Sequence, residues 1–180
     1  MNLRGVRYRA HQFWAAWHAR PTRRAIAQGR EILNPEQMAL FSQMQPSDQA
    51  HSLAVMAQIK TSPDGVPETY LHDLLVASLL HDVGKSRYPL SIWERAIIVV
   101  SEAMFPSQVE RLGAASPDGW RKAFVIAKMH PEWGASMAAE ASTTPLAIQL
   151  IREHQNPIPG ETESISYQLL RRLQAADDDH

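Results

Sequence analysis

The sequence contains no cysteine and no long apolar run. Without cysteine, disulfide bonds and thiolate metal ligands are excluded, so a bound metal must be held by histidine and carboxylate side chains. The absence of a run of about 18 or more apolar residues leaves no candidate transmembrane segment. The N-terminal residues also lack the continuous apolar stretch of a secretory signal peptide. From these absences we expect a cytoplasmic protein.

Several motifs of common enzyme classes are missing as well. The sequence has no phosphate-binding P-loop, no glycine-rich dinucleotide loop and no serine or cysteine nucleophile motif. Water activated by a metal ion is therefore the nucleophile that the residue types still allow.

Composition and charge indicate one globular domain with an unusual N-terminal segment. The 180 residues are 44% hydrophobic and 21% charged, which suits a single domain with a sizeable core. Residues 1–30 contain seven arginines and no acidic residue, whereas the rest of the chain carries 11 basic and 19 acidic side chains. We expect a basic helical arm over residues 1–33 and a domain over 34–180. The arm has three candidate partners, namely its own acidic domain, anionic lipid and nucleic acid.

Helical periodicity alternates along the chain with breaks rich in Pro, Gly, Ser and Asp, without a strand pattern or an internal repeat. The pattern predicts an all-α fold. Asn34, Ser47–Asp48 and Thr162 are the predicted helix starts, and Pro131 is a predicted helix end. One helix is expected in the arm at residues 9–19, and about eight form the bundle at residues 34–44, 48–60, 68–82, 92–105, 120–130, 132–141, 146–154 and 164–177.

The segment LLVASLLHDVGK, residues 74–85, is apolar or small almost all round until it reaches His81 and Asp82. Such a helix is expected to be buried. A buried carboxylate beside a buried histidine is costly unless the two are paired or coordinate a metal. Near a helix end both side chains reach one ion, and the two oxygens of Asp82 allow it to bridge two ions.

The order His51, then His81–Asp82, then Asp177 resembles the H…HD…D metal-binding signature of the HD phosphohydrolase superfamily. The surrounding segments AHSLAV, LLVASLLHDVGK and LLRRLQAAD extend the resemblance to about residues 45–180. It implies an all-α HD-domain bundle that hydrolyses a phosphomonoester or phosphodiester. The implied partner is a phosphorylated small molecule, a nucleotide by analogy with the family.

Two further histidines, His130 in HPEWGA and His154 in REHQNP, resemble the extra ligands of the two-metal branch that includes the HD-GYP phosphodiesterases. The resemblance implies that His51, His81, Asp82 and Asp177 bind one ion, and that Asp82, His130 and His154 bind the second. Gln155 stands where the branch often has another histidine, and QNPIPGE replaces the GYP segment. Hydrolysis of cyclic di-GMP therefore does not follow from the resemblance.

The resemblance also implies the cofactors and the remaining roles. Histidine and carboxylate ligands suit one or two divalent ions, and Mn, Fe, Co, Ni, Zn and Mg are the candidates. Asp82 and Lys85 are the expected catalytic residues, since the Lys85 ammonium is suited to stabilise charge or donate a proton. Lys85 and Arg87 are expected to bind the substrate.

Other interpretations stay open at this point. His130 and His154 end predicted helices and are also consistent with C-terminal residues that interact with the helix dipole. Asp177 is consistent with an acidic tail, and the second HD dipeptide, His72–Asp73, is interpreted as surface residues. As functions, a di-iron oxygenase and a non-catalytic sensor compete with hydrolysis. The metal, the substrate and the oligomeric state are not determined by the sequence.

Overall fold

The computed structural model describes residues 19–62, 65–89, 91, 93–94, 121–160 and 164–180, and within these ranges the regular structure is helical without a strand. The all-α prediction is therefore confirmed. The helices predicted at 9–19 and 92–105 fall almost entirely outside these ranges. The elements are α2 (Arg23–Ile32), α3 (Pro35–Phe41), α4 (Pro46–Thr61), α5 (Glu68–Leu80), the 3₁₀-helix η1 (Val83–Arg87), α8 (Lys122–Glu140), α9 (Pro145–Glu153) and α10 (Ile165–Asp178).

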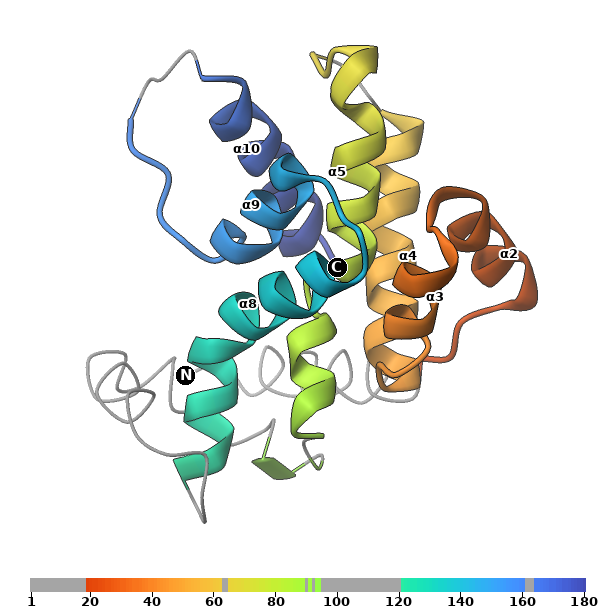
Figure 1. The fold of residues 1–180 in the computed structure, drawn as a ribbon, viewed down its shortest axis with the longest axis vertical. Coiled ribbons are helices and arrows are strands. Elements are labelled where there is room, and N and C mark those ends of the chain that lie inside the picture. Colours follow the sequence, from red (N-terminus) through yellow and green to blue (C-terminus); the bar gives the residue numbers. More distant parts are fainter. Residues whose placement is uncertain (1–18, 63–64, 90, 92, 95–120, 161–163) are drawn as a thin grey trace, which may run out of the picture.

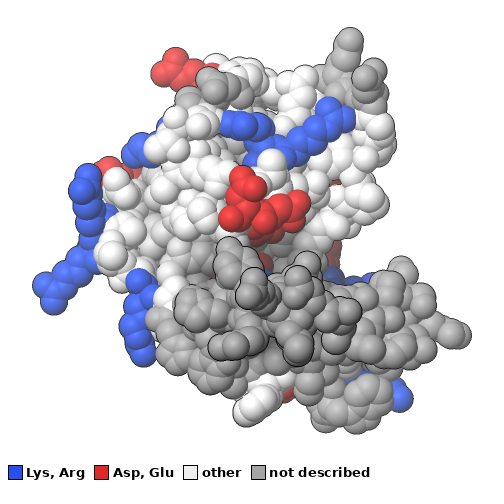
Figure 2. Space-filling view, turned by 180° about the vertical axis from the view of Figure 1, so that it is seen from behind, with Lys and Arg blue, Asp and Glu red and all other residues white. Residues whose placement is uncertain are grey.

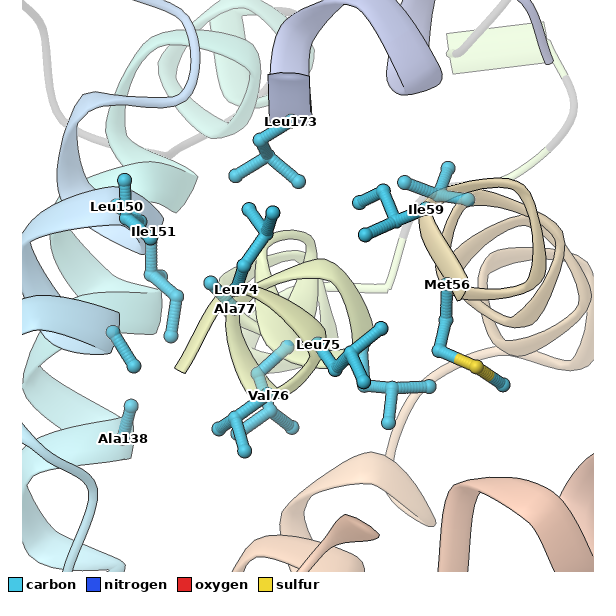
Figure 3. Packing of buried hydrophobic residues seen from close by; sticks show 14 of the residues in the cluster. Met56, Ile59, Leu74, Leu75, Val76, Ala77, Ala138, Leu150, Ile151 and Leu173 are labelled. Atoms are coloured by element: carbon cyan, nitrogen blue, oxygen red, sulfur yellow. The ribbon is translucent and has the colours of Figure 1, made fainter. Parts of the chain in front are cut away.

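Helix α5 lies at the centre of the bundle. Every residue from Leu74 to Leu80 is buried, as expected for a helix that is apolar on all sides. Helix α4 runs beside α5, with α2 and α3 on one side of this pair and α8, α9 and α10 on the other (Figure 1). Figure 3 shows the side chains that enclose α5, which come from α4 (Met56, Ile59), α8 (Ala138), α9 (Leu150, Ile151) and α10 (Leu173). None of the described helices has the length and apolar character needed to cross a membrane.

Helix α2 lies in the segment expected to be a helical arm, but a separate helix at these residues was not predicted. It begins after Thr22, whose hydroxyl accepts a hydrogen bond of 3.1 Å from the Ala25 amide. Its buried face includes Gly29, which lies against Leu53 of α4 and Leu79 of α5. The apolar positions of α2 follow helical spacing, but four basic and acidic residues between them mask the pattern. This part of segment 1–33 packs against the bundle.

Charged side chains are unevenly distributed over the surface. The arginines of α2 are exposed. Figure 2 shows one group of Asp and Glu side chains near the middle of the rear face, with Lys and Arg side chains above this group and along the left edge.

The prediction that Pro131 ends a helix is wrong. Helix α8 continues through Pro131 as far as Glu140. Proline lacks the amide hydrogen that would bond to the Ala127 carbonyl, and it normally kinks or breaks a helix. The ribbon of α8 bends along its length (Figure 1). Buried residues on both sides of the proline pack into the protein, so tertiary contacts keep the helix intact at the cost of a kink.

The other predicted helix ends that fall within the described residues are correct to within about three residues. Asn34 forms the capping box of α3 with Gln37. Helix α4 begins at Pro46, one residue before the predicted Ser47–Asp48 start, because proline fits the first turn of a helix. Helix α5 ends at Leu80, where the chain tightens into η1. Thr162, the predicted start of α10, lies outside the described residues, and the helix is preceded by Ser164.

A close crossing of backbones positions η1 on α8. A Cβ atom added to Gly84 would lie 2.0 Å from the His130 carbonyl oxygen and 2.7 Å from the Gly134 nitrogen. A Cβ on Gly134 would in turn lie 3.2 Å from the Gly84 nitrogen. Only glycine at position 84 permits this approach. The contact brings Asp82, two residues earlier, next to α8.

We expect Gly84→Ala to destabilise the protein by about 1–3 kcal/mol or more, because the new methyl group overlaps a backbone that has no free direction to move. Urea denaturation followed by circular dichroism measures the loss. Gly160→Ala is the matched control, since a Cβ there meets nothing within 4 Å. Equal unfolding midpoints for Gly84→Ala and the control would show that the crossing tolerates a side chain.

Candidate metal centre

Six side chains from five parts of the fold converge at one end of α5. His51 lies in α4, His81 and Asp82 join α5 to η1, His130 lies in the middle of α8, His154 directly follows α9, and Asp177 lies near the end of α10. They form two groups of three, in each of which the candidate ligand atoms lie within 4.8 Å of one another. The structure thus brings together all six residues that the sequence singled out as metal ligands.

The first group consists of His51, His81 and Asp177. His51 Nε2 lies 2.7 Å from Asp177 Oδ1 in a hydrogen bond. His81 Nε2 lies 3.4 Å from the same oxygen, without the alignment of a hydrogen bond. His81 is buried, whereas the other two side chains are about one-quarter exposed. This group is therefore accessible from solvent.

The second group consists of Asp82, His130 and His154, all of them buried. Asp82 Oδ1 lies 3.3 Å from His130 Nε2 and 4.0 Å from His154 Nε2. The two histidine Nε2 atoms lie 3.3 Å from each other. Three ligand atoms therefore face a common point in the interior.

Asp82 links the two groups, because its two oxygens face different sides. Oδ1 faces His130 and His154, while Oδ2 lies 3.7 Å from His81 Nε2. Burial would raise the pKa of Asp82, but the Lys85 ammonium and the neighbouring histidines outweigh burial and hold that pKa well below its usual range. Asp82 is thus a carboxylate at neutral pH, with one oxygen facing each group.

The three buried histidines share one orientation. Each places Nδ1 against a carbonyl oxygen of its own helix, at 2.9 Å from Ser78 for His81, 3.0 Å from Ile126 for His130 and 2.7 Å from Ile151 for His154. A carbonyl oxygen only accepts, so Nδ1 carries the hydrogen in all three rings. In the neutral ring, the Nε2 lone pair then points into the centre, which is the usual arrangement of a metal-bound imidazole.

The donor set fits a divalent cation. Burial, together with the charges of His81 and His130, lowers the pKa of His154 to about 3, and burial also lowers the pKa of His130. Both rings are therefore neutral, and their Nε2 lone pairs face each other across 3.3 Å. His81 Nε2 is buried without a hydrogen-bond partner among the described residues. Converging lone pairs and an unpartnered buried nitrogen are costly without a cation.

The two carboxylates near His81, those of Asp82 and Asp177, also determine the charge of the centre. Burial acts to lower the pKa of His81, but Asp82 and Asp177 outweigh it and raise the pKa. Burial acts to raise the pKa of Asp177, yet the hydrogen bond with His51 and the proximity of His81 leave that pKa lowered. Both aspartates are therefore ionised, and they attract positive charge to the centre.

Lys85 contacts the centre directly, but through a ligand carboxylate. Its ammonium lies 2.7 Å from Asp82 Oδ2. Arg87, the other basic residue of η1, is exposed and lies over aromatic rings instead of a carboxylate. The two residues that the sequence assigned to the substrate therefore occupy different positions, one at the centre and one outside it.

Gln174 is a residue of this region that the sequence did not single out. Its side-chain amide donates hydrogen bonds to the carbonyl oxygens of His154, at 2.9 Å, and Asn156, at 2.8 Å. Gln174 lies one helical turn before Asp177 on α10, so it ties the His154 turn to the helix that carries a ligand of the first group. Its spacing from Asp177 was the available signal, but glutamine on a helix has no distinctive pattern.

The second HD dipeptide takes no part in the centre. His72 is exposed, and Asp73 accepts a hydrogen bond of 2.6 Å from the Thr144 hydroxyl. Asp179, two residues after Asp177, accepts a hydrogen bond of 2.7 Å from Gln58. The acidic C-terminal residues are thus divided between the centre and the surface.

Comparison with known proteins agrees with this geometry. Residues 49–180 match the family model of the HD domain, which includes all six converging residues. The chain therefore belongs to the HD domain family, within the HD superfamily of metal-dependent phosphohydrolases. Neither a curated protein nor a solved structure matches the chain.

We expect the protein to bind two Mn²⁺ ions and His154→Ala to bind about one, because the second group then keeps only two ligands. Plasma mass spectrometry after gel filtration measures the stoichiometry. A metal concentration 100 times the dissociation constant should stabilise the wild type by about 2.7 kcal/mol for each bound ion in thermal melts. His72→Ala serves as the matched control and should behave as the wild type. Unchanged metal content in His154→Ala would exclude His154 as a ligand.

Gln174→Leu should weaken metal binding at the second group by roughly 10–100-fold, the usual effect of removing a group that orients a ligand. Calorimetric titration with Mn²⁺ resolves the weakened class of site. Gln58→Leu removes a glutamine hydrogen bond on the surface and should leave both affinities unchanged. A general loss of stability in Gln174→Leu, with normal metal affinity, would instead assign Gln174 a purely structural role.

Proposed function

We propose that this protein is a metal-dependent phosphohydrolase that cleaves a phosphomonoester or phosphodiester with a metal-activated water. The observation that carries the proposal is the position of Asp82, an ionised buried carboxylate whose two oxygens face two separate groups of ligand atoms. An arrangement with one shared carboxylate suits a pair of divalent ions. Membership of the HD domain family supports the same chemistry.

The six residues would hold the ions. His51, His81 and Asp177 form the accessible side, where solvent and substrate enter. His130 and His154 form the buried side, which keeps bulk water away from Asp82. When bound, divalent ions lower the pKa of a water molecule and stabilise negative charge on phosphoryl oxygens. The candidate ions are Mn, Fe, Co, Ni, Zn and Mg.

Lys85 and Arg87 supply positive charge from the chain itself. The Lys85 ammonium lies at Asp82 Oδ2, on the side of the carboxylate that faces the accessible group. From this position we infer that it stabilises charge on the phosphoryl group or donates a proton to the leaving oxygen. Arg87 is exposed on the same short helix, and its guanidinium suits a second phosphate oxygen. A nucleotide is the proposed substrate.

The test is a hydrolysis panel of nucleotides, cyclic dinucleotides and aryl phosphates, each with Mn²⁺, Fe²⁺, Co²⁺, Ni²⁺, Zn²⁺ or Mg²⁺. We expect turnover that depends on the metal and falls to background in Asp82→Ala, because that variant loses the ligand shared by both groups. His72→Ala is the control and should retain full activity.

Two outcomes contradict the proposal. Activity in Asp82→Ala equal to that of the wild type would exclude a shared carboxylate. Iron-dependent oxygen uptake with an organic substrate, without release of phosphate or of an alcohol from any phosphoester, would instead indicate an oxygenase.

A further inference from the structure

Two aromatic side chains that the proposed hydrolysis does not use form a cluster with Arg87. The rings of Tyr88 and Trp133 lie 5.3 Å apart between centroids and are tilted by 55°. The guanidinium of Arg87 lies 5.9 Å from the Tyr88 centroid and 5.5 Å from the Trp133 centroid. Both rings are partly exposed and pack on Ala123 and Ile126 of α8. We call these three residues the aromatic cluster.

The aromatic cluster lies directly beside the candidate metal centre. Asp82 and Tyr88 flank η1 on either side, and Lys85 lies within it. On α8, Trp133 lies about one helical turn after His130. The two elements meet at three successive points, namely Asp82 with His130, Gly84 with the His130 carbonyl, and Tyr88 with Trp133. The rings are therefore the next side chains outward from two of the ligands.

The chemistry of the aromatic cluster suits a planar aromatic ligand. Tyrosine and tryptophan present flat faces on which another ring stacks, and a guanidinium stacks in the same way. Arg87 has no carboxylate partner among the described residues, and its exposed guanidinium already lies over both rings. A nucleobase offers a planar face to the rings, and the attached phosphate offers negative charge to the arginine.

We propose that Arg87, Tyr88 and Trp133 form the nucleobase-binding part of the substrate site, with the scissile phosphate at the metal centre. This inference rests on the proposed phosphohydrolase function, which it makes more specific. Because stacking accepts any base, the site distinguishes nucleotides from phosphoesters without an aromatic group and has little preference among the four bases.

The experiment compares adenosine, guanosine, cytidine and uridine 5′-monophosphates with ribose 5-phosphate, which carries the same sugar and phosphate without a base. Values of kcat/KM are measured on the metal-loaded full chain. Dissociation constants from calorimetry are measured in parallel and decide the outcome where no turnover occurs. Base stacking is worth about 1–3 kcal/mol, so each nucleotide should exceed ribose 5-phosphate by roughly five- to 150-fold.

Two variants test the aromatic residues of the cluster, and a third is the control. Trp133→Leu and Tyr88→Leu should each remove most of the preference for nucleotides and leave the values for ribose 5-phosphate within about twofold of the wild type. Having one variant from each element keeps the test decisive if the other fails to fold. Trp93→Leu is the matched control, because Trp93 is 75% exposed, and it should retain the full preference.

The possible results separate this inference from the proposed function. Turnover or binding that is equal for nucleotides and ribose 5-phosphate overturns the aromatic subsite and leaves hydrolysis intact. A preference that survives in both Trp133→Leu and Tyr88→Leu also overturns it. Tighter binding of nucleotides that depends on the two rings, without hydrolysis of any phosphoester, supports the subsite and contradicts the hydrolase.

Discussion

The negative charge of Asp82 is the constraint on which the site depends. A buried carboxylate is costly unless positive charge and hydrogen bonds compensate for the lost hydration. Here the compensation comes from Lys85 on the following 3₁₀-helix, from His81 at the end of the central helix and from His130 on α8. Each of these partners comes from a different packed element. The charge of Asp82 therefore depends on the packing of the helices around α5, and this packing in turn depends on that charge.

Helix geometry also determines the direction in which the histidines point. His81 and His154 directly follow α5 and α9, where the last carbonyl groups of a helix lack amide partners, and their Nδ1 atoms bond to two of these carbonyls. His130 uses the Ile126 carbonyl one turn earlier, beside the proline that interrupts the hydrogen bonding of α8. Satisfying these backbone groups leaves three Nε2 atoms directed at the centre, so the backbone itself orients the ligand atoms.

The sequence predicted the helical class from local periodicity, and it predicted the six converging residues from their resemblance to the HD signature and its two-metal branch. An apolar segment that ends in His81–Asp82 is unusual enough to identify a buried charged site, and α5 confirms the burial. Two features could not be predicted in this way. Local rules end a helix at Pro131, whereas packing on both sides preserves α8. The hydrogen bonds of Gln174 to the turn after α9 join residues about 20 positions apart, and a local sequence pattern cannot predict such a contact.

The contact between Gly84 and α8 has a consequence for how the protein can change over evolutionary time. The separation between Asp82 and His130 is determined where two backbones meet, without an intervening side chain. Substitutions in the apolar core change the volume of one side chain, and neighbouring side chains can repack to fill the space. A contact between two backbones cannot be compensated in this way. Substitutions in the core therefore leave the separation between Asp82 and His130 unchanged. Position 84 is therefore expected to stay invariant in homologues whose core residues diverge.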